Sequence, residues 1–180
     1  MGALNGFPQV APFQTSEFKT TSEYGGANLG SLFTDGNGNI FQLVDCQEAF
    51  VAGEVVVINQ AFQASQATST SRGAIGVLMS TPTTSDTYAW AQVYGSCAIA
   101  ICASGVTSTG VLVIPATSDV GYFGEGTSSA ANRVFGALSR AACSTATTPG
   151  GWGSAPVGLA TVQLLYPYVN GVATDDGQTT

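Results

Sequence analysis

The fold is decided by the stretch Tyr88-Ala89-Trp90-Ala91-Gln92-Val93-Tyr94-Gly95-Ser96-Cys97-Ala98-Ile99-Ala100-Ile101-Cys102, the most apolar part of the chain. Alternate residues of a strand share a face, so its first half has an aromatic-rich face and a face of small apolar residues. The two sets are Tyr88, Trp90, Gln92 and Tyr94, and Ala89, Ala91 and Val93. After Gly95 both faces are apolar, which is typical of a central strand covered on both sides. We interpret the stretch as core; the alternative is a binding face that uses Trp90 and Tyr94.

Short β-type runs separated by turn residues lie on both sides of this stretch. The spacers, such as residues 81–85 and 144–154, are rich in Thr, Ser, Gly and Pro, which favour turns and loops. We expect strands near residues 40–45, 54–59, 74–80, 88–94, 97–103, 110–115, 133–140 and 158–166. The sequence therefore predicts an all-β domain over residues 34–169, with little or no helix.

Two stretches of this domain resemble each other. In each, a Gly and an apolar strand (residues 53–58 and 110–114) are followed by a polar connection and a second strand interrupted by Gly (residues 72–78 and 133–138). A Gly inside a strand indicates a bulge or sharp bend, a usual device for closing a small barrel. The alternative is that the similarity arises by chance in a chain rich in Gly and Val.

The two ends of the chain have no strand period. Residues 1–33 carry scattered phenylalanines, prolines and Ser/Thr clusters, and residues 170–180 are polar. Disordered segments are usually poor in aromatic residues, so we interpret residues 1–33 as an extended arm that docks on a partner rather than as a disordered leader. Residues 170–180 are interpreted as a solvated tail, or one that reaches a neighbouring subunit. The first ten residues lack the pattern of a secretory signal, and we expect synthesis in the cytoplasm.

Charge and composition exclude several classes of function. The net charge is −7, and the four cationic residues are scattered singly, so neither nucleic acid nor an anionic membrane is an expected partner. Charged residues make up 8% of the chain, so its polar surface must come mostly from Ser, Thr, Asn, Gln and Gly. Such a surface suits a protein that sits against other protein.

The residues for familiar catalysis are absent from the sequence. The chain has no His, which excludes Ser-His-Asp and Cys-His systems, and its only Lys, Lys19, lies in the expected arm. No spacing selects a carboxylate pair, and no phosphate-binding loop is present. We expect no enzyme activity and no cofactor.

No metal site is expected either. Asp35-Gly36-Asn37-Gly38-Asn39 resembles the start of a calcium loop, but Ile40 and Cys46 occupy positions where such a loop needs Gly and Glu. We interpret this run as a turn before the first strand. Without His or paired Cys, zinc is the least favoured reading of the four cysteines; buried free thiols are favoured over disulfides. The odd offset of Cys97 and Cys102 predicts that they point to opposite faces.

Six short apolar runs, most of them anchored by Gly, lie within residues 40–166, the part of the chain that carries a family resemblance. They are Ala52-Gly53-Glu54-Val55-Val56-Val57, Gly73-Ala74-Ile75-Gly76-Val77, Val93-Tyr94-Gly95, Gly110-Val111-Leu112-Val113, Val134-Phe135-Gly136-Ala137-Leu138 and Ala160-Thr161-Val162-Gln163-Leu164. This spacing resembles the capsid decoration, or cement, proteins of tailed bacteriophages. The resemblance implies a small β-barrel or β-tulip module that trimerises on the capsid surface, binds the major capsid protein and clamps neighbouring capsomers.

The resemblance also implies that an extended terminal arm touches capsid subunits. Exposed aromatic residues anchor interfaces disproportionately, so we expect Phe7, Phe13, Phe18 and Tyr24 to contact capsid or neighbouring subunits. The alternatives are a phage tail or fibre domain, a carbohydrate-binding module that stacks sugars on Trp90, Trp152 or Tyr168, and, third, an unusual hydrolase.

Overall fold

The computed structural model describes residues 29–82, 87–103, 106–108, 110–114, 120–126, 132–143 and 157–170. These ranges contain ten strands and no helix, which confirms the predicted all-β class. The strands are β1 (Leu32–Thr34), β2 (Ile40–Cys46), β3 (Val55–Ile58), β4 (Gln63–Gln66), β5 (Arg72–Leu78), β6 (Thr87–Ala103), β7 (Val111–Val113), β8 (Gly124–Gly126), β9 (Val134–Ser139) and β10 (Val157–Asn170).

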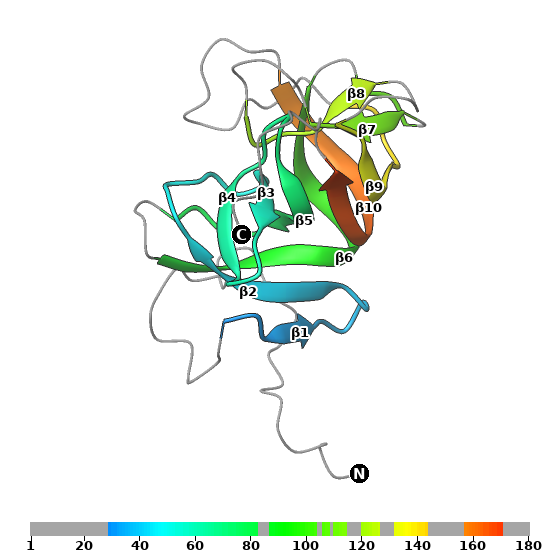
Figure 1. The fold of residues 1–180 in the computed structure, drawn as a ribbon. Helices are drawn as coiled ribbons and strands as arrows, with labels where there is room; N and C mark the ends of the chain where they lie inside the picture. Colours follow the sequence, from blue (N-terminus) through cyan, green and yellow to red (C-terminus); the bar gives the residue numbers. More distant parts are fainter. Residues whose placement is uncertain are drawn as a thin grey trace.

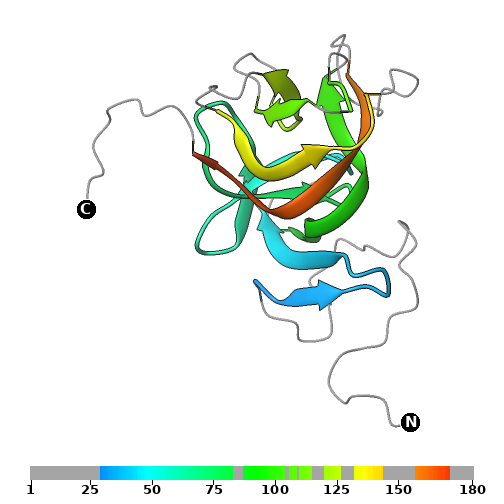
Figure 2. The ribbon, with the colours of Figure 1, turned by 90° about the vertical axis from the view of Figure 1, so that its right-hand side faces the viewer.

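Eight of these strands form one sheet that partly closes on itself. The order is β1-β2-β4-β3-β5-β6-β10-β9, and a further pairing of β2 with β6 completes a ring through β2, β4, β3, β5 and β6. Within the ring only β2 and β4 are parallel. β1 and β2 lie at one end of the molecule and the separate β7–β8 ribbon lies at the other (Figures 1 and 2). The fold is therefore barrel-like, with β9 at the end of the sheet order opposite to β1.

β6 is the strand on which the ring depends. Its first half pairs with β2 and its second half with β10, so the two strands expected at residues 88–94 and 97–103 are one bent strand. The bend occurs at Gly95, whose φ is 98°, and a Cβ there would lie 2.1 Å from Asn39 Oδ1. The Ser96 N–H donates to the same oxygen over 3.0 Å. Only Gly fits this conformation at this close approach.

The turn before β2 supplies that Asn39. The Asp35 carboxylate accepts hydrogen bonds from the backbone N–H groups of Asn37 and Asn39 and from Asn39 Nδ2, over 2.8–2.9 Å. This confirms the interpretation of residues 35–39 as a turn. Its carboxylate fixes the amide that locks the bend of β6.

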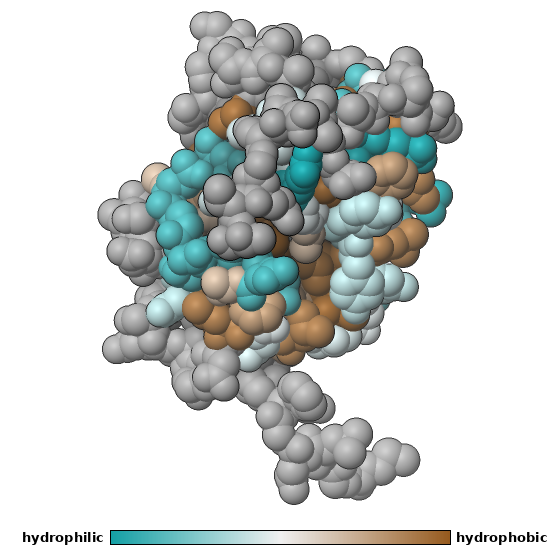
Figure 3. Space-filling view, in the orientation of Figure 1, coloured by the Kyte–Doolittle hydropathy of each residue, from teal (hydrophilic) through white to brown (hydrophobic). Residues whose placement is uncertain are grey.

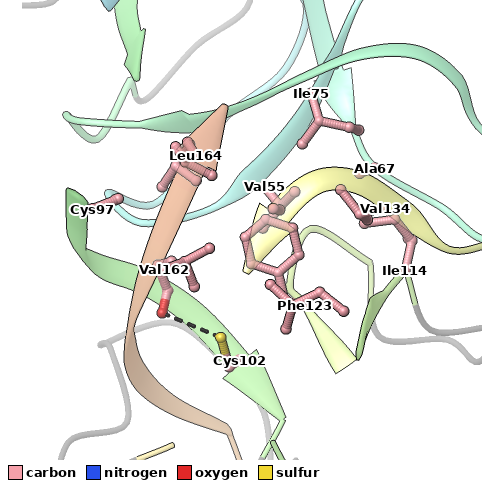
Figure 4. Packing of buried hydrophobic residues seen from close by; sticks show 14 of the residues in the cluster. Val55, Ala67, Ile75, Cys97, Cys102, Ile114, Phe123, Val134, Val162 and Leu164 are labelled. Atoms are coloured by element: carbon pink, nitrogen blue, oxygen red, sulfur yellow. Dashed lines mark hydrogen bonds between the residues drawn. The ribbon is translucent and has the colours of Figure 1, made fainter. Parts of the chain in front are cut away.

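The main hydrophobic core lies between β3, β5, β6, β9, β10 and the segments near β7 and β8. Figure 4 shows the ring of Phe123, which is fully buried, beside Val55, Val134 and Ile114. The Phe123 N–H donates to the carbonyl oxygen of Ile101 over 2.9 Å, which ties its segment to β6. Two smaller clusters lie around β2 and the first half of β6.

The prediction that Cys97 and Cys102 point to opposite faces is wrong. Both side chains are buried in the main core, together with Ala100. The register of β6 against β10 shifts between Ala160 and Val162, where three steps along β6 match two along β10. This bulge reverses the alternation of side chains, so an odd offset returns to the same face.

The interrupting glycines of the two similar stretches differ in role. Gly136 has a φ of 73° and lies where the register of β9 and β10 shifts, as expected for a bulge. At Gly76 no positive φ occurs; a Cβ there would lie 2.9 Å from the Ala91 Cβ, so close packing of β5 on β6 is the reason for Gly. The bend prediction is therefore confirmed at one of the two positions.

The sheet starts inside the segment expected to be the arm. β1 pairs with β2, and the ring of Phe33 lies 6.2 Å from that of Phe41 and 6.1 Å from that of Trp90. At the other end, β10 continues to Asn170. Residues 1–28 and 171–180 lie outside the described residues.

Candidate interaction surface

The four predicted interface residues, Phe7, Phe13, Phe18 and Tyr24, lie outside the described residues, as does Trp152. Trp90 is only 7% exposed and packs with the aromatic cluster under β1, which confirms the core interpretation of this strand. The Trp90 indole therefore offers no platform to a ligand.

An apolar surface is instead present on β9 and β10. Phe135, Leu138, Leu165, Tyr166 and Tyr168, which we call the β9–β10 face, are between 36% and 54% exposed. They are five of the six large hydrophobic residues that are exposed among the described residues; the sixth, Leu32, lies on β1. In Figure 3, hydrophobic residues reach the surface on the right, where Figure 1 places β9 and β10.

Two left-handed backbone positions bring these residues to one surface. Leu138 follows Phe135 by three positions, and both are exposed because Gly136, between them, interrupts the alternation of β9. A Cβ on Gly136 would lie 2.7 Å from the Leu165 carbonyl oxygen. On β10, Tyr166 has a φ of 50°, and the consecutive residues Leu165 and Tyr166 are both exposed.

Ring contacts hold the three aromatic residues of the β9–β10 face in place. Phe135 and Tyr168 are cross-strand partners whose rings stack, with centroids 5.1 Å apart and planes 15° apart. The Arg133 Cζ lies 5.0 Å from the centroid of the Phe135 ring, a cation–π geometry. The ring of Tyr166 lies 5.3 Å from that of Tyr94. These contacts preorder the side chains, which lowers the entropy lost when a partner covers them.

The two strands that form the face carry no charged residue. β9 and β10 contain no Asp, Glu, Lys or Arg, and the residues that flank β9 are Arg133 and Arg140. The strands of the face are therefore neutral, in a chain of net charge −7. Low charge and exposed aromatic residues together are typical of the centre of a protein–protein interface.

One carboxyl group is buried away from this face. Glu54 is 1% exposed; it accepts hydrogen bonds from the Val51 N–H over 2.6 Å and from Gln66 Nε2 over 2.5 Å. Burial raises its pKa to about 7, the two hydrogen bonds lower it, and the charge of Glu48 raises it slightly. No group of three metal-ligating side chains occurs around it or elsewhere in the described ranges.

The four cysteines are free, as predicted. Three are buried, and burial raises the pKa of Cys97 to about 11 and that of Cys46 to about 12, with the charge of Asp45 adding to the latter. Cys143 is half-buried; its thiol donates to the Cys102 carbonyl oxygen over 3.2 Å, and burial raises its pKa as well. Protonated thiols are poor nucleophiles and poor metal ligands, so these groups act as core residues.

Sequence reasoning named only Tyr168 from the β9–β10 face. A signal for the other residues is present in the run Leu164-Leu165-Tyr166-Pro167-Tyr168, where consecutive residues are apolar or aromatic, so that both faces of the strand carry such residues. This run is at the end of β10, the strand next to the edge strand β9.

No helix in the described ranges is long and apolar enough to cross a bilayer. No protein-family model, curated protein or solved structure matches the chain.

Proposed function

We propose that this protein is a virion structural protein, a capsid decoration or cement protein that binds the outside of the major capsid shell and stabilises neighbouring capsomers. The observation that carries the proposal is an all-β body with few charged residues, 8% of the chain, that exposes a preordered aromatic surface, the β9–β10 face, as expected for a subunit of a larger protein assembly. The resemblance of the Gly-anchored strands to phage cement proteins supports the same role.

The proposed mechanism is mechanical. A shell protein needs affinity from contact area and from exclusion of water, neither of which requires titratable groups. Each contact can be weak, because many copies on a closed shell act at high effective concentration. In this role the protein is made in the host cytoplasm, works on the capsid surface as a homotrimer, and uses no cofactor, enzyme activity, nucleic acid or membrane.

The aromatic residues of the N-terminal arm are assigned to the capsid. Phe7, Phe13 and Phe18 recur at intervals of five or six residues, and the segment carries a single Lys. Aromatic anchors in pockets supply most of the energy of many protein interfaces. We therefore assign these residues, with Tyr24, to grooves between capsid subunits.

A carbohydrate-binding module, on a tail fibre or elsewhere, is the second candidate. The exposed rings of Tyr166, Tyr168 and Phe135 favour it, because such modules use rows of exposed aromatic residues. The arrangement of these rings counts against it: Phe135 is stacked on Tyr168 and is also contacted by Arg133, so little of its ring face remains for a sugar.

Cosedimentation with undecorated capsids of the phage that encodes the chain tests the proposal. We expect the full chain to pellet with capsids, and the combined variant Phe7→Ser, Phe13→Ser and Phe18→Ser to bind at least tenfold more weakly. Leu32→Ser, which alters an exposed residue of β1, is the control and should bind as the unaltered chain does. Absence of binding by the full chain, together with binding to an oligosaccharide array that is lost in Tyr168→Ala, would replace the capsid role with the glycan role.

A further inference from the structure

We infer that the β9–β10 face is where a second copy of this chain binds. The inference rests on the proposed function, in which the arm binds the capsid. The β9–β10 face then joins the copies of the decoration protein to one another. Three features of the face favour a second copy: its area, its charge and its place in the sheet.

The area of the face matches what one side of a stable interface requires. With about 200 Å² for a large side chain, the exposed fractions of Phe135, Leu138, Leu165, Tyr166 and Tyr168 amount to about 450 Å² of mostly apolar surface. A typical interface buries about 800 Å² on each partner, of which about 57% is apolar, so it needs about 450 Å² of apolar surface. Polar neighbours such as Gln163, half-buried beside Leu138, would form the rim.

The charge around the face is suited to contact between copies of an acidic chain. Two molecules of net charge −7 repel each other unless they meet where that charge is absent. β9 and β10 carry no acid, and Arg133 and Arg140 stand at the two ends of β9. The described acids lie elsewhere, at positions 35, 45, 48, 54 and 125. Contact at this face therefore brings the arginines of one copy, and no acid of β9 or β10, towards an acidic second copy, so the repulsion between the two net charges is smaller here.

The place of the face in the sheet allows a partner to reach it. β9 is the last strand in the order of the eight-stranded sheet and pairs there with β10; on its other side, Arg133, just before the strand, bridges to Val113 of β7. The outward residues Phe135 and Leu138 lie on this edge strand. Exposed apolar edge strands favour association with another chain, and soluble proteins normally avoid them by placing charge there. β9 carries no such charge, and its outward residues Phe135 and Leu138 remain exposed, so another chain can cover them.

Sedimentation velocity of the full chain without capsids tests the inference. At up to about 100 µM, we expect a species heavier than the 18.2 kDa monomer, with three copies if the proposed trimer holds. Leu138→Glu and Leu165→Glu, each at a residue that is more than two fifths exposed, should shift the protein to monomer by weakening self-association at least tenfold. Leu32→Glu is the matched control, because Leu32 is equally exposed and lies on β1, at the opposite end of the sheet order. Its oligomer should persist.

Circular dichroism of the variants separates loss of association from loss of folding, because a monomer that is still folded keeps the spectrum of the unaltered protein. The two substitutions lie on different strands, so that one remains informative if the other prevents folding. A chain that is monomeric at the highest concentration would overturn the inference. So would an oligomer that survives both β9–β10 substitutions, or one that Leu32→Glu dissociates equally well. Self-association without capsid binding would instead leave the inference standing and refute the capsid role.

Discussion

The buried carboxyl group of Glu54 makes the stability of the protein depend on pH in a predictable direction. Its pKa is raised from the ordinary 4.5 to about 7, chiefly by burial. Because the folded protein holds this proton to a higher pH than the unfolded chain does, folding is favoured below pH 4.5 and loses stability as the pH rises through 7. A difference of this size corresponds to about 3 kcal/mol in the free energy of unfolding.

Glu54→Gln isolates this contribution. A Gln at this position keeps an oxygen that accepts from the Val51 N–H, and Gln66 can turn its amide so that its oxygen accepts from the new NH₂ group. We expect the free energy of unfolding of the variant to be close to that of the unaltered protein at about pH 5. At about pH 8 it should exceed that of the unaltered protein by about 3 kcal/mol. Glu48→Gln is the control: Glu48 is exposed, and its charge is the smallest of the causes, so its effect should be well under that of Glu54→Gln.

Urea denaturation followed by tryptophan fluorescence, repeated from about pH 5 to about pH 8, measures these free energies. The informative quantity is the difference between Glu54→Gln and the unaltered protein as a function of pH, because the other titrating groups contribute equally to both. A difference that stays constant across this range would refute the reasoning. It would mean that the carboxyl group ionises in the folded protein as it does in the unfolded chain.

Two further predictions concern the core. Gly95→Ala should lower the free energy of unfolding by roughly 2–4 kcal/mol, because φ is 98° and the new methyl would meet Asn39 Oδ1; urea denaturation measures this, and a loss below 1 kcal/mol would contradict it. In the folded protein, Cys46, Cys97 and Cys102 should resist a thiol reagent that labels all four cysteines after unfolding, as counted by mass spectrometry. Rapid labelling of more than one cysteine at neutral pH would show that the core is open.

The local chemistry of turns and of the central strand could be predicted from the sequence. Asp35 to Asn39 form the expected turn because Asp and Asn side chains bond to backbone N–H groups two to four residues on. The apolar run after Gly95 forms the second half of β6 and contributes Cys97, Ala100 and Cys102 to the main core, but the predicted cover on both faces is incomplete, because Ala98 is exposed. The short strands β1, β4 and β8 are not among the predicted strands, because none of them has the continuous apolar run that marks the equally short β3 and β7.

Features that depend on register could not be predicted. A bulge in β6 between Cys97 and Cys102 brings the two side chains to the same face of the strand. Such a bulge can be recognised only when the pairing with the partner strand is known. The same holds for the β9–β10 face: Leu165 and Tyr166 are both exposed because β10 changes register against β9 between Leu164 and Tyr168. Alternation within a single sequence predicts that one of two such neighbours is buried.

The central claim, that the protein reinforces a capsid shell, is tested most directly by heating undecorated, DNA-filled capsids with and without the purified chain and measuring the temperature at which they release DNA. The account predicts a higher release temperature that rises with added protein until the shell is saturated. An unchanged release temperature at protein concentrations that saturate binding would contradict it.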